Sequence, residues 1–513
     1  MHPSAIRAIA FLAGLVYAAG FWPWPFWWLT ITALAVLPAC VLRARQGAGW
    51  IGLAFGLGCF VAGLSWLYIS MHRYGGMPAP LAALALLLFA GWLALFPVLA
   101  CCVLQRCAVG PGRTKVTAAR YAGAIAACFA GAWTLAEMLR GWLLTGFPWL
   151  AAGYAQVDGP LSSFAPWLGV YGVSTMAALS ASGIGLAVTG RNLRAPGILL
   201  ALVPVAGGLA LAQIDWTSAH GEPVRIRLVQ GNIAQDLKFD PQRTLAAMQW
   251  YAGQVAPAPM QLTVLPETAW TVPWQYTPWN VRETLLAALS GGGRLAIGMP
   301  LPAQAQARTQ FPAPDADEPR RITNSAALID ANGSIAWRYD KRHLVPFGEF
   351  VPPGFRWFVD LMQIPLGDFA RGSADQPPFV LGTQKLAFDI CYEDLFGEEI
   401  AAQVRQGATI LINVSNIAWF GDSHALPQHL QIARMRALET ARPMLRATNT
   451  GVTAAIDADG SVLAQLPPYT AGVLDVTVQG QDRLTPAARY GNLPALILAL
   501  ALLAVGAGVL RSR

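Results

Sequence analysis

The sequence predicts a two-part protein, with a polytopic α-helical membrane domain and an α/β domain inserted before its last helix. Of the 513 residues, 55% are hydrophobic and only 12% are charged, whereas a soluble domain carries about 25% charged residues. Apolar stretches dominate residues 1–213 and 491–513, while residues 214–490 alternate between short apolar runs and helical patterns. The composition excludes a disordered chain, a collagen and a coiled coil.

The membrane domain is predicted to contain eight spans. A transmembrane helix needs about 20 mostly apolar residues. The stretches that meet this requirement are 8–24, 26–42, 49–71, 79–105, 120–143, 162–190, 196–213 and 493–510. Seven spans therefore precede the α/β domain and one follows it. The first span runs into an aromatic segment, residues 21–28, which is typical of an interfacial belt, so we predict a retained helix and not a cleaved signal sequence.

Basic residues predict the orientation of these spans. If alternate connections are assigned to two sides, eleven Lys and Arg residues fall on one side and two on the other. The first side holds Arg7, Arg43, Arg45, Arg106, Arg113, Lys115, Arg120, Arg191, Arg194, Arg511 and Arg513, and the other holds Arg73 and Arg140. Basic loops stay in the cytoplasm, so both termini are predicted to be cytoplasmic and residues 214–492 to lie outside. We interpret the net charge of +7 as orientation and not as binding to nucleic acid.

The outward segment is predicted to fold as a mixed α/β domain. Its strands are expected at residues 224–230, 261–266, 294–299, 325–329, 335–339, 386–391, 409–414, 444–448, 452–456 and 473–478, where β-branched and apolar residues cluster. Helical patterns at 397–406 and 425–442 fall between strands, and turn residues at 331–334 and 457–460 predict hairpins. Proline and alanine at 302–320 predict an irregular surface loop. We therefore expect a layered domain in which helices cover the sheets.

One cysteine stands apart from the others. Six of the seven lie in the predicted spans or beside their cytoplasmic ends, and Cys391 alone lies in the outward domain. An oxidising exterior favours paired cysteines, so an unpaired Cys391 is either a small buried hydrophobe or a functional thiol. It ends an apolar strand and is followed by an acidic turn, and strand ends that open into loops are where α/β folds place chemistry.

A nucleophilic thiol needs a base and a cation, and the sequence offers one of each. Glu267 follows the strand at 261–266, and Lys341 follows the strand at 335–339. An acid at a strand end is more often a helix cap, and a lone lysine is more often on the surface. The chain has only four lysines beside 31 arginines, however, and a compact ammonium can donate to an oxyanion in ways that a planar guanidinium cannot.

These residues carry a resemblance to a known family. Residues 266–268, 339–343 and 391–393 resemble, in chain order, the Glu–Lys–Cys triad of the nitrilase superfamily, and the resemblance covers roughly residues 222–480. It implies an αββα sandwich. Further matching stretches are 343–352, 413–416, 419–421, 433–443 and 446–451. With seven spans before this domain and one after it, the whole chain resembles the apolipoprotein N-acyltransferase family. Ile417 and Phe239 depart from the family pattern, which usually has Asp and Trp there.

The resemblance implies a reaction and its participants. An acyl chain would pass from a phospholipid to a Cys391 thioester and then to the N-terminal amine of a diacylglyceryl apolipoprotein, with Glu267 as base and Lys341 at the oxyanion. This is the final step of lipoprotein maturation, in the periplasm at a bacterial inner membrane, by a protein expected to be a monomer. The residues expected around the triad are Glu349, Tyr392, Glu393, Phe239 and Trp419. No cofactor or metal is expected, because the six histidines show no zinc-ligand spacing.

Two alternatives and two unexplained features stay open at this stage. A membrane-tethered amidase or nitrilase would use the same triad with water as acceptor, and a transporter or scaffold would only bind. The apolar loops at 269–279, 353–366 and 419–420 either reach into the membrane to guide acyl chains or pack in the core. Glu137 and Arg140, within the fifth predicted span, are expected either to be functional or to pair and reach the membrane surface.

Overall fold

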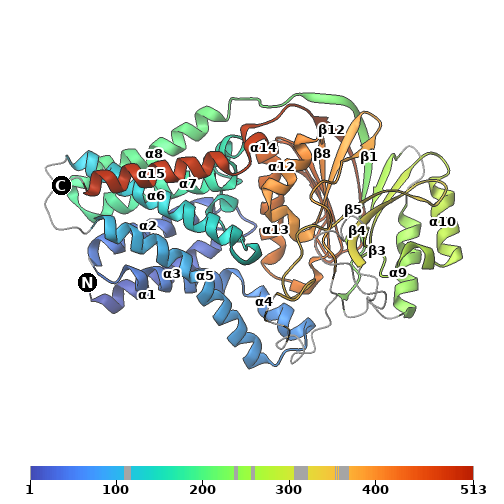
Figure 1. The fold of residues 1–513 in the computed structure, drawn as a ribbon, viewed down its shortest axis with the longest axis horizontal. Helices are drawn as coiled ribbons and strands as arrows, with labels where there is room; N and C mark the ends of the chain where they lie inside the picture. The colour runs from blue at the N-terminus through green and yellow to red at the C-terminus, as the bar shows by residue number, and fades with distance from the viewer. Residues whose placement is uncertain are drawn as a thin grey trace.

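The computed structural model describes residues 2–44, 46–108, 117–235, 241–255, 260–304, 322–352, 354, 356 and 369–511. The molecule is elongated, with the apolar helices and both chain ends at one end and the β-sheets at the other (Figure 1). The predicted loop at 302–320 and the apolar stretch at 353–366 lie mostly outside the described residues, as does Phe239.

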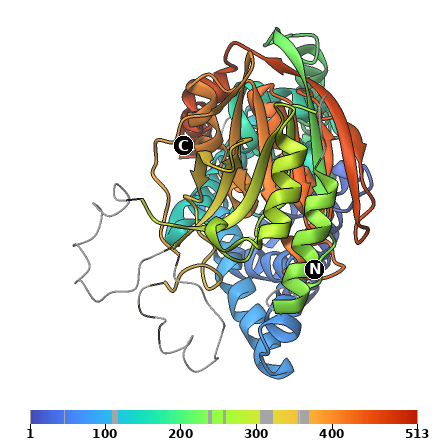
Figure 2. The same cartoon turned by 90° about the vertical axis from the view of Figure 1, so that its right-hand side faces the viewer.

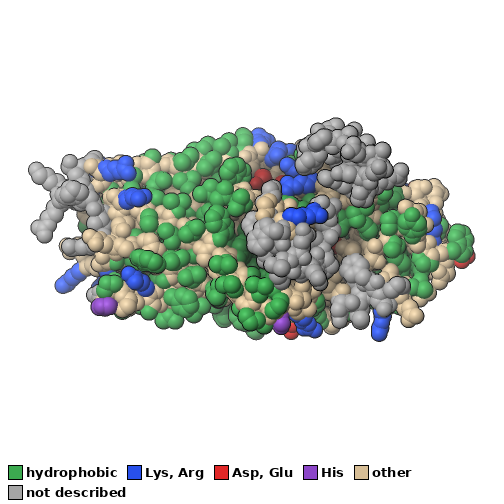
Figure 3. All heavy atoms as spheres, turned by 60° about the horizontal axis from the view of Figure 1, so that its bottom comes forward, with side chains coloured by type: hydrophobic (Ala, Val, Ile, Leu, Met, Phe, Trp, Pro, Cys, Tyr) green, Lys and Arg blue, Asp and Glu red, His purple; other side chains and the backbone are tan. Residues whose placement is uncertain are grey.

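The apolar helices, most of them from the N-terminal part of the chain, pack together as a bundle. Their bounds are α1 Pro3–Ala19, α2 Trp27–Ala44, α3 Ala48–Gly63, α4 Trp66–Ile69, α5 Ala79–Ala108, α6 Ala118–Trp142, α7 Ala165–Thr189, α8 Arg194–Leu211 and α15 Leu493–Arg511. Figure 3 shows hydrophobic side chains over the surface of this half of the molecule. Such a surface is typical of a protein whose solvent is the bilayer.

Among the described residues, fewer helices than the predicted eight have the length and hydropathy that a membrane span requires. Six of those helices are long and apolar enough to cross a membrane, and a seventh is obtained if α3 and the helical segment Trp66–Tyr74, bent by 52°, form one span. Helix α1 is apolar but has only 17 residues. The several apolar helices are confirmed, and the count of eight stays a prediction.

The last helix joins the bundle through a close contact with α6. A Cβ added at Gly131 would lie 2.5 Å from the carbonyl oxygen of Ala499, so only glycine allows the two backbones to approach this closely. Small residues of this kind are the usual contact points between membrane helices. The contact explains how residues 493–511 return to the bundle after the α/β domain.

The α/β domain contains two mixed sheets, each of six strands within the described residues. Their orders are β12-β1-β2-β3-β4-β5 and β11-β10-β9-β8-β7-β6. The bounds are β1 Ala219–Gln230, β2 Leu262–Val264, β3 Arg294–Pro302, β4 Ile322–Ile329, β5 Ile335–Asp340, β6 Phe379–Leu381, β7 Gln384–Ile390, β8 Ile410–Ser415, β9 Met444–Thr448, β10 Ala454–Ile456, β11 Val462–Gln465 and β12 Gly472–Gln481. All ten predicted strands are present, and both predicted hairpin turns join antiparallel strands. The sequence missed β6 and β11, which are short edge strands.

Helices cover both outer faces of the paired sheets. Helices α12 (Gly397–Arg405) and α13 (Ala425–Thr440) lie between one sheet and the membrane helices, while α9 (Pro241–Gln254) and α10 (Trp279–Leu289) cover the other sheet at the far end (Figures 1 and 2). Buried side chains such as Leu228, Phe388 and Ile412 fill the space between the sheets. The layered αββα order is therefore present, as the resemblance implied.

Two tryptophans of the apolar loop at residues 269–279 pack inside the α/β domain. Trp270 and Trp274 are buried in one core cluster with residues of α9 and α10, so for these two rings the core-packing alternative holds and not the one in which residues 269–279 reach the membrane. Their indole N–H groups are satisfied internally, by Thr277 Oγ1 and by the carbonyl oxygen of Gly333. Burial with a paired N–H is the ordinary behaviour of a core tryptophan.

Candidate active site

Cys391 lies where β7 ends and a 3-10 turn, Cys391–Leu395, begins. Its φ is +54°, a conformation that costs a non-glycine residue about 1–3 kcal/mol and that recurs at functional sites. Strand β7 pairs in parallel with β8, and the register sets Ile390 beside Val414. The thiol is therefore carried past the end of the sheet, where its side chain is only partly buried.

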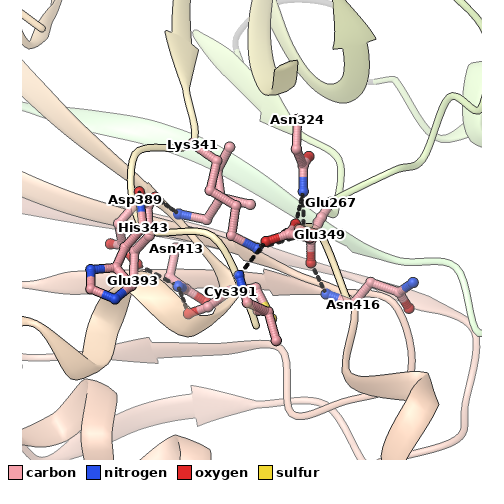
Figure 4. A network of polar contacts seen from close by, with 12 residues as sticks. Glu267, Asn324, Lys341, His343, Glu349, Asp389, Cys391, Glu393, Asn413 and Asn416 are labelled. Carbon is pink, nitrogen blue, oxygen red and sulfur yellow. Dashed lines mark hydrogen bonds and ion pairs between the residues drawn. The ribbon is translucent and has the colours of Figure 1, made fainter. Parts of the chain in front are cut away.

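Glu267 reaches the same place from the other sheet. It follows β2, and its backbone passes so close to β3 that a Cβ added at Gly298 would lie 2.6 Å from the Cα of Glu267. The carboxylate is 6% exposed. Its Oε2 accepts from the backbone N–H of Asn416 (2.8 Å), and its Oε1 accepts from Asn324 Nδ2 (2.7 Å). These donors fix the carboxylate facing Lys341 and Cys391 (Figure 4).

Lys341 directly follows β5 and is buried, with 1% exposure. Its Nζ lies 2.8 Å from Glu349 Oε1 and 3.3 Å from Glu267 Oε1. Burial by itself lowers the pKa of this ammonium, but the two carboxylates and the Cys391 thiol together hold that pKa well above its ordinary value. Lys341 is therefore a permanent cation at neutral pH, and its burial excludes the alternative of a surface lysine.

The environment keeps Cys391 protonated at rest. Burial raises the pKa of the Cys391 thiol well above its ordinary value, Glu267 adds to this rise, and Lys341 acts in the opposite direction. A thiol in this state reacts only if a base removes its proton as it attacks. Glu267 is a buried carboxylate in a position to act as this base, and Lys341 is a cation available to a developing oxyanion.

The remaining predicted residues divide into four groups. Glu349 contacts Lys341 directly, because its Oε1 accepts from both Lys341 Nζ and Asn324 Nδ2, each at 2.8 Å. Trp419 lies in the turn Ile417–Phe420 and packs against Tyr74 of the membrane domain, with ring centroids 6.1 Å apart. Phe239 is outside the described residues.

Glu393 and Tyr392 hold segments together. The Oε1 of Glu393 accepts from the backbone N–H groups of Arg342 (2.6 Å) and His343 (3.0 Å), and its Oε2 accepts from that of Ile390 (2.7 Å). This carboxylate therefore joins the segment after Lys341 to the strand before Cys391. Burial raises the pKa of Glu393 to about 8. The Tyr392 hydroxyl donates to the carbonyl oxygen of Gly146, which belongs to the membrane domain (2.9 Å).

Sequence reasoning missed Asn324 as a site residue. It lies on β4, next to the register position that pairs Ser325 with Asp340, and its amide donates to both Glu267 and Glu349. Nothing in the local sequence distinguishes it from a strand residue, because its role exists only through strand pairing. Asn416, by contrast, falls in a stretch that carried the family resemblance. The nearby departure Ile417 is fully buried, so its apolar side chain packs in the core.

Within the described residues, no group of three or more His, Cys, Asp and Glu side chains is arranged to hold a metal ion. The arrangement that does converge is a thiol, a carboxylate base and a buried ammonium. This set can perform nucleophilic acyl transfer: attack on a carbonyl carbon, stabilisation of an oxyanion and proton transfer to and from the leaving and entering groups.

Comparison with known proteins gives matches along nearly the whole chain. Residues 13–183 match the family model for the apolipoprotein N-acyltransferase N-terminal domain, and residues 225–485 match that for carbon-nitrogen hydrolases. The chain is 47% identical over 507 residues to an apolipoprotein N-acyltransferase of Ralstonia nicotianae, covering 98% of this chain and 91% of that protein. It is 44% identical over 547 residues to one of Bordetella bronchiseptica, covering 99% and 97%. Among solved structures, it is similar to an amidase from Nesterenkonia sp., with a TM-score of 0.35 and 22% identity, covering 50% of this chain and 91% of that one.

Proposed function

Because the chain belongs to the apolipoprotein N-acyltransferase family, we propose that it transfers an acyl chain from a phospholipid to the N-terminal amine of diacylglyceryl apolipoproteins through a thioester on Cys391. The observation that carries this assignment of residues is the buried cluster of Glu267, Lys341 and Glu349 facing the Cys391 thiol (Figure 4). A membrane protein with such a cluster has both the nucleophile and a lipid solvent that supplies the acyl donor.

The first half-reaction forms the thioester. Glu267 takes the thiol proton as the sulfur of Cys391 attacks the ester carbonyl, and Lys341 together with backbone N–H groups stabilises the oxyanion. Collapse of the intermediate breaks the ester C–O bond, and the proton held by Glu267 passes to the leaving alkoxide. The lysophospholipid departs, and the acyl group stays on sulfur.

The second half-reaction forms the amide. The amine of the acceptor attacks the thioester carbonyl, and Glu267 takes a proton from the nitrogen. The C–S bond then breaks, and the proton held by Glu267 passes to the leaving sulfur to return the thiol. Glu349 supports both halves, since its contact with Lys341 (2.8 Å) keeps the ammonium charged and in place. An amide is more stable than a thioester, so the transfer runs downhill.

The proposed topology has eight spans, with residues 1–213 forming the first seven and residues 491–513 the eighth. The bent pair of α3 and α4 and the short α1 supply the two spans beyond the six that meet the length criterion among described helices. Both termini would lie in the cytoplasm and residues 214–490 in the periplasm, which places the triad on the side where lipoproteins mature. The protein would act as a monomer, and no metal or cofactor would take part.

Mass spectrometry tests the proposal. Incubation with phospholipid alone should add one acyl mass to the purified protein, located on the peptide that contains Cys391. A diacylglyceryl peptide with a free N-terminus should then discharge this mass, giving ping-pong kinetics, and the same peptide with a blocked amine should not. Rapid release of free fatty acid without any peptide would instead favour a membrane-tethered amidase or hydrolase.

A further inference from the structure

The loop that follows α6 is held in an unfavourable conformation. Leu144, Thr145 and Leu150 all have positive φ angles, of 54°, 75° and 61°. Each such residue costs about 1–3 kcal/mol and persists only where the surroundings determine the backbone. Residues 143–154 connect α6 to the segment before α7, and we call them the docking loop. The contacts made by this loop explain what holds it.

The docking loop contacts both chain segments that carry the proposed catalytic residues. The carbonyl oxygen of Thr145 accepts from Nε2 of His343, two residues after Lys341 (2.9 Å). The carbonyl oxygen of Gly146 accepts from the hydroxyl of Tyr392, which directly follows Cys391 (2.9 Å). We call residues 341–343 the lysine segment and the 3-10 turn Cys391–Leu395 the nucleophile turn. Through two successive carbonyl groups, the docking loop therefore contacts both of them.

Two aromatic residues of the same loop extend this contact. The hydroxyl of Tyr154 donates to the carbonyl oxygen of Leu395, the last residue of the nucleophile turn (3.1 Å). The indole of Trp149 donates to Gln428 Oε1 (2.7 Å) and stacks on His429 with centroids 5.7 Å apart. His429 in turn lies 3.2 Å from a carboxylate oxygen of Asp394, within the nucleophile turn. Trp149 is 2% exposed, so its contacts are shielded from solvent.

Glu137 and Arg140 of α6 hold the docking loop from the membrane side. Arg140 donates to the carbonyl oxygens of Phe147 (2.8 Å) and Trp149. Glu137 Oε1 accepts from the backbone N–H of Ala152 (2.9 Å). Both side chains are 3% exposed, which excludes the alternative in which they reach the membrane surface. Burying two charged groups within a span is costly, and here each one satisfies backbone groups of the loop.

We propose that Glu137 and Arg140 are positioning residues for the acyl transfer, acting through the docking loop to set the nucleophile turn against the lysine segment. This inference rests on the proposed roles of Cys391 and Lys341. The membrane domain thereby does more than anchor the enzyme, since it supplies the template on which two segments of the other domain are aligned. Misplacing reacting groups by about 1 Å can cost about 100-fold in rate.

The test compares Arg140→Lys with Leu139→Ala in the full-length protein. Nη1 of Arg140 donates to both carbonyl groups, and lysine keeps the charge but has a shorter side chain whose ammonium cannot occupy the position of Nη1. Leu139 is the neighbouring residue on α6 and is 38% exposed, so its truncation leaves the loop contacts intact. Two quantities are measured per folded molecule: the rate of acylation by phospholipid, and the rate at which iodoacetamide alkylates the Cys391 peptide. Thermal unfolding gives the folded fraction.

Arg140→Lys should acylate about 10-fold to 100-fold more slowly, with little change in the phospholipid concentration that gives half the maximal rate, and its Cys391 alkylation rate should change several-fold. Leu139→Ala should match the wild type in both. Acylation and alkylation at wild-type rates in Arg140→Lys would overturn the inference.

If Arg140→Lys does not fold, Tyr154→Phe tests the inference instead, because it removes one hydroxyl contact with the nucleophile turn. A few-fold slower acylation supports the inference, and an unchanged rate overturns it. If the wild type itself is not acylated, the proposed function fails, and the alkylation rates alone decide on positioning.

Discussion

Replacing Lys341 with methionine separates what this residue does for stability from what it does for catalysis. The side chain is 1% exposed and lies between two carboxylates, at 2.8 Å from Glu349 and 3.3 Å from Glu267. Methionine has a similar length and no charge, so Lys341→Met leaves two buried carboxylates facing each other without a cation. Removing one partner of a buried ion pair costs about 3–5 kcal/mol, which corresponds to a fall of roughly 6–20 °C in the melting temperature of a domain of this size.

The charge-balanced double variant provides the matched comparison. Lys341→Met with Glu349→Gln removes one positive and one negative charge, so a single buried carboxylate remains, still held by Asn324 and the N–H of Asn416. Most of the lost thermal stability should return. The acylation rate should not, because an oxyanion donor is missing in both variants, and the loss of one such donor costs about 100-fold to 1,000-fold.

The assay measures two quantities on the same preparations, the melting temperature in detergent and the rate of acyl-mass gain on Cys391 with phospholipid alone. If the double variant regains both stability and acylation, Lys341 only neutralises the two carboxylates and the oxyanion is held by other groups. If the melting temperature of Lys341→Met equals that of the wild type, the buried ion pairs do not stabilise the fold by the roughly 3–5 kcal/mol expected.

Three further predictions concern the same site. Cys391→Ser should abolish the acyl mass, whereas changing the other six cysteines to alanine should leave it intact; intact mass spectrometry after incubation with phospholipid checks both. Asn324→Leu should slow acylation and lower the melting temperature, since hydrogen bonds to charged groups contribute about 1.5–3 kcal/mol each and this amide donates to both Glu267 and Glu349; a rate equal to that of the wild type would show that those carboxylates need no such support. The raised pKa of the Cys391 thiol means that its thiolate fraction keeps rising with pH, so iodoacetamide alkylation of Cys391 should accelerate through pH 9, and a plateau below pH 8 would contradict the assigned environment.

The sequence alone predicted most of the architecture, because the signals are local. Bilayer thickness requires about 20 apolar residues per span, and six of the observed helices begin and end within three residues of the predicted stretches. Helix α1 is displaced by five residues, and the stretch 49–71 is interrupted after Gly63. The central strands are recovered for the same reason, since β8 and β9 are buried along their whole length and a strand buried on both faces must be a continuous apolar run. The family assignment was also available from the sequence, because the segments with Glu267, Lys341 and Cys391 each follow a strand in the expected order.

The tertiary structure decided which polar residues act together. Asn324 joins the site only because antiparallel pairing of β4 with β5 brings it beside Lys341, and no local pattern encodes that register. Trp270 and Trp274 have the composition of a membrane-seeking loop, but the packing of α9 and α10 over them makes them core residues. Glu137 and Arg140 were visible as unusual charges in a span, yet their partners are backbone groups of a loop whose path depends on contacts with residues about 200 to 300 positions away. Local propensity and hydropathy are properties of neighbouring residues, whereas a buried charge finds its partners only when distant segments close around it.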